Sequence, residues 1–297
     1  MQDLKITLRR NFGPYRTDTT TYLKPDRKRV EEQQRYRQQL WVGGPATPVR
    51  PPRVATVTRC DLGQIFQLNL EDREYTSRPI PKPLSPEEQK ERAEELKARA
   101  AQGPQPQRPA QPNLLIEITT NDTGERKQMF GYTARHVITT EKRTPLEGAS
   151  QVPTENVTDG WYIDLDTSIS CDLPRRPGAF GLLLAGGNGK IDYPTFKFVG
   201  QRETGFALAT TRSDTLFQPD GSRREGVPSD TAQVTDLSTA PLPGRLFDIP
   251  LGFREVRESR RAAQMPWWGR ALVSLHTTWS RFERALTRGF RKVPSRE

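Results

Sequence analysis

The clearest pattern in the chain is the alternation of hydrophobic and polar residues within residues 54–76. Phe66 and Leu68 are separated by a single polar residue, which is the period of two expected for a strand with one face buried and one face in water. Turn-forming residues stand at 61–63 and 71–73. We therefore predict three short antiparallel strands joined as a β-meander.

Two other segments repeat this alternation. Ile6 and Leu8 have a threonine between them and arginines after them, and Ile116 and Ile118 have a glutamate between them. Each segment predicts a strand with one apolar side. The chain is therefore expected to be mainly β.

The segment 130–140 is the longest β-favouring stretch and has no internal proline. It can therefore occupy a central position in a sheet. Asn, Asp and Gly at 121–124 predict the turn that precedes this strand. Residues 144–159 lack a regular pattern, and we expect a loop there.

Residues 85–112 form a charged insertion between the predicted strands. Ser85, Pro86 and Glu88 match the N-cap, first-turn proline and capping-box positions of a helix, which we expect to reach about residue 101. A proline-rich linker follows. We accordingly divide the chain into a sheet domain at 1–256, which contains this insertion, and a C-terminal helix at 257–297.

Composition limits the partners that the protein can have. The net charge is +10 and the hydrophobic content only 33%, so the surface is basic and should attract anionic partners. No nucleic-acid-binding module is present, and we expect no nucleic-acid partner. The first residues run directly into strand-like sequence without a secretion signal, so either the protein is cytosolic or its true start lies upstream.

Cysteine and histidine are rare. Cys60 and Cys171 either form one disulfide in an oxidising compartment or remain two unpaired thiols. With only His136 and His276 besides them, we expect no metal site and no cofactor. His136 lies within a predicted strand and no G-x-S-x-G motif accompanies it, so we expect no enzymatic activity.

The C-terminal segment has the pattern of an amphipathic helix. Successive steps of 100° place apolar and aromatic side chains on one side and arginines on the other. Such a helix fits an anionic membrane surface, where each basic residue contributes about 1 kcal/mol, or the groove of a partner protein. The apolar side contains Trp268, Leu272, Leu275, Trp279, Phe282, Leu286 and Phe290, and the basic side contains Arg270, Arg281, Arg284 and Arg288.

Several motifs, taken in order, resemble an uncharacterised bacterial cell-envelope family with a LolA-like, lipoprotein-carrier-like fold. They are YLKPDRKRVEE, TVTRCDLGQIFQLNLEDREYT, GERKQMFGYTARHVITTEKR, DGWYIDLD, TGFALATT and LFDIPLGF. The resemblance implies a strongly curved antiparallel sheet, an incomplete barrel whose concave face holds a lipid tail or another hydrophobic group. It also implies export to the periplasm or cell envelope, and no enzymatic activity.

A sheet with little helix to cover it must curl or expose apolar surface, and exposed apolar surface is often a binding site. We therefore expect a non-catalytic binding protein for a hydrophobic small molecule or lipid tail; the alternative is a protein scaffold or sensor that docks a partner through its C-terminal helix. Ordinary core packing is the other interpretation for each candidate ligand-binding side chain. These candidates are Ile6, Leu8, Phe66, Leu68, Ile116, Ile118, Tyr132 and Ile138.

Overall fold

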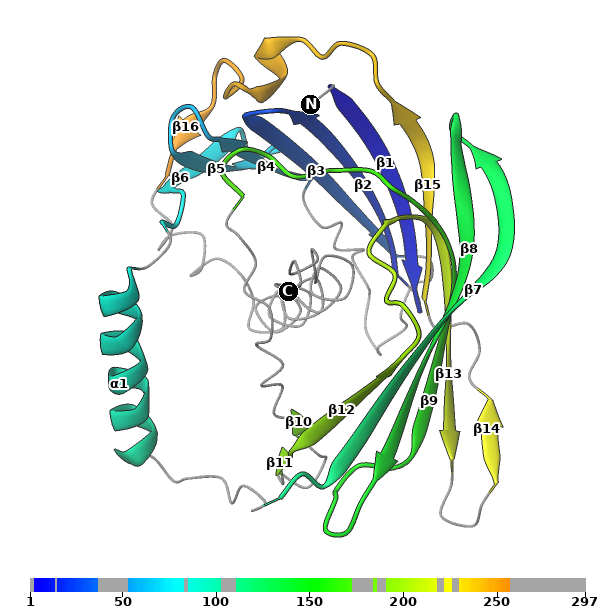
Figure 1. The fold of residues 1–297 in the computed structure, drawn as a ribbon. Helices are drawn as coiled ribbons and strands as arrows, with labels where there is room; N and C mark the ends of the chain where they lie inside the picture. The colour runs from blue at the N-terminus through cyan, green and yellow to red at the C-terminus, as the bar shows by residue number, and fades with distance from the viewer. Residues whose placement is uncertain are drawn as a thin grey trace, which may run out of the picture.

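The computed structural model describes residues 3–13, 15–36, 53–82, 85–102, 111–172, 184–185, 191–217, 222–225 and 230–256. Within this part of the chain, fourteen strands form one large sheet, and a pair of two-residue strands forms a second, small one. The prediction of a mainly β fold is therefore confirmed, and the large sheet is curved and does not close into a barrel (Figure 1).

The N-terminal half of the sheet is a meander in which each strand pairs with the next. Short turns connect these strands except between β3 and β4, which end and begin at Tyr36 and Val54. All of its pairs are antiparallel and in continuous register. Its strands are β1 (Leu4–Phe12), β2 (Tyr15–Lys24), β3 (Arg27–Tyr36), β4 (Val54–Arg59), β5 (Gln64–Asn69) and β6 (Glu74–Pro79).

The C-terminal half adds strands on the other side of β1. The order across the whole sheet is β12-β7-β8-β9-β13-β15-β1-β2-β3-β4-β5-β6-β16, with β14 paired to β13. The two outermost strands, β12 and β16, pair in parallel with β7 and β6. The strands of this half are β7 (Leu114–Met129), β8 (Tyr132–Pro145), β9 (Thr154–Ile163), β12 (Pro194–Val199), β13 (Phe206–Phe217), β14 (Arg223–Glu225), β15 (Asp230–Ser238) and β16 (Arg254–Glu255); β10 (Leu184–Ala185) and β11 (Ile191–Asp192) form the small sheet.

The turn predicted at 121–124 lies instead inside a strand. The chain reverses at Phe130 and Gly131, which have φ angles of 51° and 81°, and β7 continues through residues 121–124 as an irregularity between Asp122 and Arg126. The carboxylate of Asp122 accepts a hydrogen bond from the backbone N–H of Gly124 over 2.9 Å. The local turn chemistry that we identified is therefore real, but it forms a bulge and not a hairpin end.

The prediction of a loop at 144–159 is wrong for its second part, because β9 begins at Thr154. Asn156 and Thr158 on this strand pair with Glu141 and Thr139 of β8. The paired residues of both strands are polar here, so the sequence lacks the alternation of apolar and polar residues that marks a half-buried strand.

The insertion contains the helix α1 (Pro86–Gln102). Its first turn has the reciprocal hydrogen bonds of a capping box: the N–H of Glu88 donates to Ser85 Oγ over 3.1 Å, and the N–H of Ser85 donates to Glu88 Oε2 over 2.6 Å. Most described side chains of α1 are exposed. The helix therefore adds little to the core.

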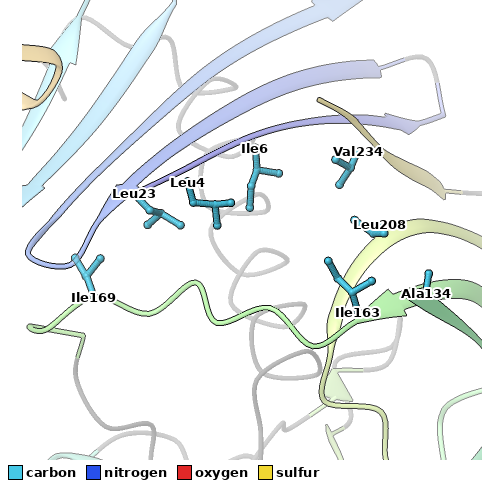
Figure 2. Packing of buried hydrophobic residues seen from close by; sticks show 8 residues of the cluster. All are labelled: Leu4, Ile6, Leu23, Ala134, Ile163, Ile169, Leu208 and Val234. Atoms are coloured by element: carbon cyan, nitrogen blue, oxygen red, sulfur yellow. The ribbon is translucent and has the colours of Figure 1, made fainter. Parts of the chain in front are cut away.

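The main apolar core lies between the two halves of the sheet (Figure 2). Residues 164–172, here called the crossing segment, leave β9 and reach the turn between β2 and β3, where the N–H of Ser170 donates to the carbonyl of Pro25 over 2.9 Å. Ile169 of this segment is only 5% exposed. The buried members of the core are Leu4, Ile6, Leu23, Ala134, Ile163, Ile169, Leu208 and Val234.

A second core covers the opposite face of the N-terminal strands. The residues that follow β15 include a short 3-10 helix, η1 (Gly244–Phe247), and in Figure 1 they run along the outside of the curve. Phe247 is 1% exposed and packs in the same cluster as Val57 and Leu68. Hence we call this the outer face, and the face that carries Leu4 and Ile6 the inner face.

Candidate functional site on the inner face

The strand register does not place the eight candidate ligand-binding residues on one face of the sheet. Directly paired residues in neighbouring strands point to the same face, and neighbours along one strand point to opposite faces. Four of the candidates therefore share the inner face, and the expectation of one common apolar lining is not met. Ile6, Leu8, Ile116 and Ile118 lie on the inner face, Phe66, Leu68 and Ile138 lie on the opposite one, and Tyr132 lies at the turn end of β8, beyond the register shift between β9 and β13.

All eight are at least partly buried, but in different environments. Ile6 is 4% exposed in the main core, and Leu8 and Tyr132 pack against that core. Phe66 and Leu68 belong to the outer cluster under Phe247, so a segment of the chain itself already covers them. Core packing is therefore the role that the structure shows for these five residues.

Charged side chains occupy the middle of the inner face, a feature that our sequence analysis missed. On β13, Arg212 Nε donates to Asp214 Oδ1 over 3.0 Å. The amide of Asn156 on β9 joins this pair: its NH₂ group donates to Asp214 over 2.7 Å, and its oxygen accepts from Arg212 Nη2 over 2.9 Å. The three side chains thus form a closed hydrogen-bonded group across two strands.

Two ion pairs extend this group on either side. On β8, Arg143 Nε donates to Glu141 Oε1 over 2.7 Å, and Glu141 stands opposite Asn156 in the register. Towards the other half of the sheet, Arg212 stands opposite Asp230 of β15. Both nitrogens Nε and Nη2 of Arg10 on β1 contact the Asp230 carboxylate.

We call this row the charged belt, and it crosses five neighbouring strands. Its members carry charges of both signs and are mostly withdrawn from water: the side chains of Asp230, Glu141 and Arg10 are 10%, 12% and 17% exposed. Ion pairs this far from solvent cost desolvation energy, which their mutual attraction does not reliably offset. The charged belt consists of Arg143, Glu141, Asn156, Asp214, Arg212, Asp230 and Arg10.

Apolar side chains flank the charged belt at both ends. Ile116 and Ile118 stand directly opposite Arg143 and Glu141 in the register, and Phe196 of β12 packs against these isoleucines. At the other end, Leu8 and Ile6 continue the inner side of β1 beyond Arg10. The inner face therefore carries apolar side chains on β7, charged side chains from β8 to β1, and apolar side chains again further along β1.

A buried carboxylate fixes the chain next to β12. Asp192 has no exposed surface; it accepts hydrogen bonds from Asn113 Nδ2 over 2.9 Å and from both the N–H and the hydroxyl of Ser150 over 2.9 Å. Burial alone would raise the pKa of Asp192, but these hydrogen bonds hold it below the ordinary value. The ionised group thus secures the start of β12 beside β7.

Cys60 and Cys171 form a disulfide, which resolves the alternatives left open by the sequence. The bond joins the end of the crossing segment to the turn between β4 and β5, 111 residues away in sequence. The N–H of Cys60 also donates to the carbonyl of Asp26 over 2.9 Å. The crossing segment is therefore held covalently against the N-terminal half of the sheet.

His136 lies on the face of β8 opposite to the charged belt. Its Nε2 is 2.9 Å from Asp159 Oδ1, its Nδ1 is 3.1 Å from the hydroxyl of Thr123, and its ring stacks on Trp161 with 4.8 Å between centroids. The Thr123 hydroxyl also accepts the N–H of Glu125 over 3.2 Å. This hydroxyl is engaged with the backbone of the β7 bulge, so the cluster joins β7, β8 and β9.

The predicted C-terminal amphipathic helix lies at 257–297, outside the described residues. Those residues contain ten Lys and Arg against three Asp and Glu, and so hold most of the net charge of +10. Within the described ranges, no group of three His, Cys, Asp or Glu side chains is arranged to hold a metal ion. No helix in the same ranges is long and apolar enough to span a bilayer.

Comparison with known proteins adds no assignment. No family model matches the chain, and no curated protein matches it.

Proposed function

We propose that this protein is a non-catalytic binding protein of the bacterial cell envelope, whose curved sheet holds a hydrophobic ligand or a lipid-modified partner on its inner face. The resemblance to LolA-like carriers suggested this function. The observation that carries the proposal is the open sheet, whose inner face has apolar side chains at Ile116 and Ile118 next to a charged belt. Desolvated ion pairs do not reliably stabilise a fold, so a face that served only for packing would gain nothing from them.

The disulfide supports the location. A disulfide persists in the periplasm or at the cell surface and is rare in the cytosol, where thiols are kept reduced. The Cys60–Cys171 bond holds the crossing segment, so an oxidising compartment would favour the described fold. The basic segment at 257–297 is proposed to tether the sheet to an anionic membrane surface.

Two measurements test this function. Native mass spectrometry of the protein, gently purified from an envelope fraction, is expected to show a bound lipid or other apolar molecule; the bare protein alone contradicts ligand binding. Flotation with anionic vesicles is expected to carry the full chain but not a chain that ends at Glu258. Equal flotation of both chains removes the tethering role of the C-terminal segment.

A second candidate function is a scaffold for a protein partner, and the edge strand β12 favours it. Phe198 and Val199 are each 40% exposed on this strand, although both are large and apolar. Edge strands with exposed apolar side chains can accept a strand from another chain. Under this alternative, a Phe198→Lys variant loses a co-purified protein and retains any bound lipid.

A further inference from the structure

We propose that the charged belt binds the zwitterionic head group of an amphiphile, with phosphate on its arginines and ammonium on its carboxylates. The inference rests on the proposed function, because it names the class of ligand that the inner face would take. It predicts a phosphocholine- or phosphoethanolamine-type lipid and not a free fatty acid or a neutral glyceride.

The balance of charges carries this choice. The charged belt contains three guanidinium groups and three carboxylates, so its net charge is zero. Neighbouring strands lie roughly 4.8 Å apart, so groups of opposite sign recur at short intervals across the strands. Such a surface complements a head group that carries both signs, whereas a purely anionic head group would meet as much repulsion as attraction.

The existing ion pairs leave room for such contacts. Arg143 Nε donates to the oxygen Oε1 of Glu141 over 2.7 Å, and Nη2 lies 2.7 Å from the same oxygen. A guanidinium has five N–H donors and can bind a phosphate through two parallel hydrogen bonds. Asp214, at 39% side-chain exposure, is the most accessible carboxylate of the charged belt and can receive an ammonium group.

The apolar flank gives the tails a surface beside the head group. Ile116 and Ile118 adjoin Arg143 and Glu141 across one strand pair, and Phe196 and Phe198 of β12 continue this side with rings stacked 6.2 Å apart. A ligand with its head on the charged belt would thus lay its tails towards β12. This arrangement accounts for the large exposed side chain of Phe198.

The test compares ligands with identical tails. Isothermal titration calorimetry of the full-length protein uses dihexanoyl-phosphatidylcholine, dihexanoyl-phosphatidylglycerol and dihexanoylglycerol, each kept below its aggregation concentration. At least tenfold tighter binding of the phosphatidylcholine than of either of the others is expected. Equal binding of all three overturns the inference and leaves the proposed function standing, and binding of none overturns both.

Variants locate the site. Arg143→Gln and Asp214→Asn are each expected to reduce the preference for phosphatidylcholine over dihexanoylglycerol at least fivefold. The matched control is Asp122→Asn, which breaks an exposed ion pair with Arg126 on β7 and should leave the preference unchanged. If the wild-type preference exists but both charged-belt variants keep it, the head group binds elsewhere and the inference is wrong.

Discussion

The outer and inner faces of the N-terminal strands differ in what covers them. On the outer face, a segment of the chain supplies Phe247, which packs on Val57 and Leu68, and the carbonyl of Leu246 accepts a 3.0 Å hydrogen bond from buried Arg29. The cover thus buries apolar side chains and accepts a hydrogen bond from the buried guanidinium. The outer face has the character of a completed core.

On the inner face, apolar packing stops at Leu8 and charges begin at Arg10, two residues further along β1. The crossing segment covers only the end of the sheet that carries Leu4 and Leu23. The comparison suggests that the outer face serves stability, whereas the inner face keeps polar groups that packing alone does not require. The following variants test that difference, from the largest expected effect to the smallest.

Removing the outer cover should be the most destabilising change. Phe247→Ala is expected to lower the free energy of unfolding by about 3 to 5 kcal/mol, because it leaves a cavity over Val57 and Leu68. Urea unfolding followed by circular dichroism measures the loss. Leu251→Ala is the control, since Leu251 is fully exposed and its loss should change little; an effect of Phe247→Ala below 1 kcal/mol would mean that the outer cover is dispensable.

Releasing the crossing segment should have the next largest effect. A double variant, Cys60→Ser with Cys171→Ser, is expected to lose about 2 to 5 kcal/mol of stability, because the disulfide closes a loop of 111 residues. Thermal unfolding with and without a reductant gives the measurement. The wild type should respond to the reductant and the double variant should not; an unchanged midpoint in both would show that Ile169 and its contacts hold the segment unaided.

Within the charged belt, Asp230→Asn should cost about 1 to 3 kcal/mol, because it removes the carboxylate that Asp230 supplies to the largely buried Arg10. The control uses the same two strands: Lys5 and Asp236 pair at 2.8 Å with side chains 38% and 45% exposed. Asp236→Asn should cost at most about 1 kcal/mol. Similar losses for both variants in urea unfolding would show that the charged belt is no more desolvated than an ordinary surface pair.

The smallest effect is expected at low pH near the disulfide. A hydrogen bond from Arg59, together with the charge of Arg27, lowers the pKa of Asp61 from 3.8 to about 2. Its ionised form therefore stabilises the fold above about pH 4, and this contribution is lost as the pH falls towards 2. Asp61→Asn should flatten the decline of the melting temperature between pH 4 and pH 2, and an unchanged decline would place the acid-sensitive groups elsewhere.

The periodicity of the sequence predicted the central strands because their apolar residues have one buried side. Val57 lies in β4, and Phe66 and Leu68 lie in β5, as the alternation predicted. The pattern failed for residues 154–159, where both partner strands are polar on the inner face. Apolar and polar residues alternate along a strand only when one of its faces is apolar and the other polar. The alternation is absent where neither face is apolar.

The charged belt had a signal in the sequence that we did not use. Opposite charges two residues apart, as in Glu141 with Arg143 and Arg212 with Asp214, lie on the same side of a strand and can pair along it. Arg16 with Asp18 and Arg29 with Glu31 repeat this spacing elsewhere in the sheet. The spacing identifies ion pairs along single strands, but not which pairs align across neighbouring strands.

The sequence by itself determined the β-rich class, the meander and the start of α1, because these depend on side-chain period and on capping within a few residues. Tertiary structure alone decided that Cys60 meets Cys171, that Ile6 and Phe66 lie on opposite faces, and that Asp230 reaches Arg10 across the junction of the two halves. These relations depend on strand order and register between distant segments. A change of one residue in register turns every side chain of a strand to the other face, and short-range patterns do not fix that choice.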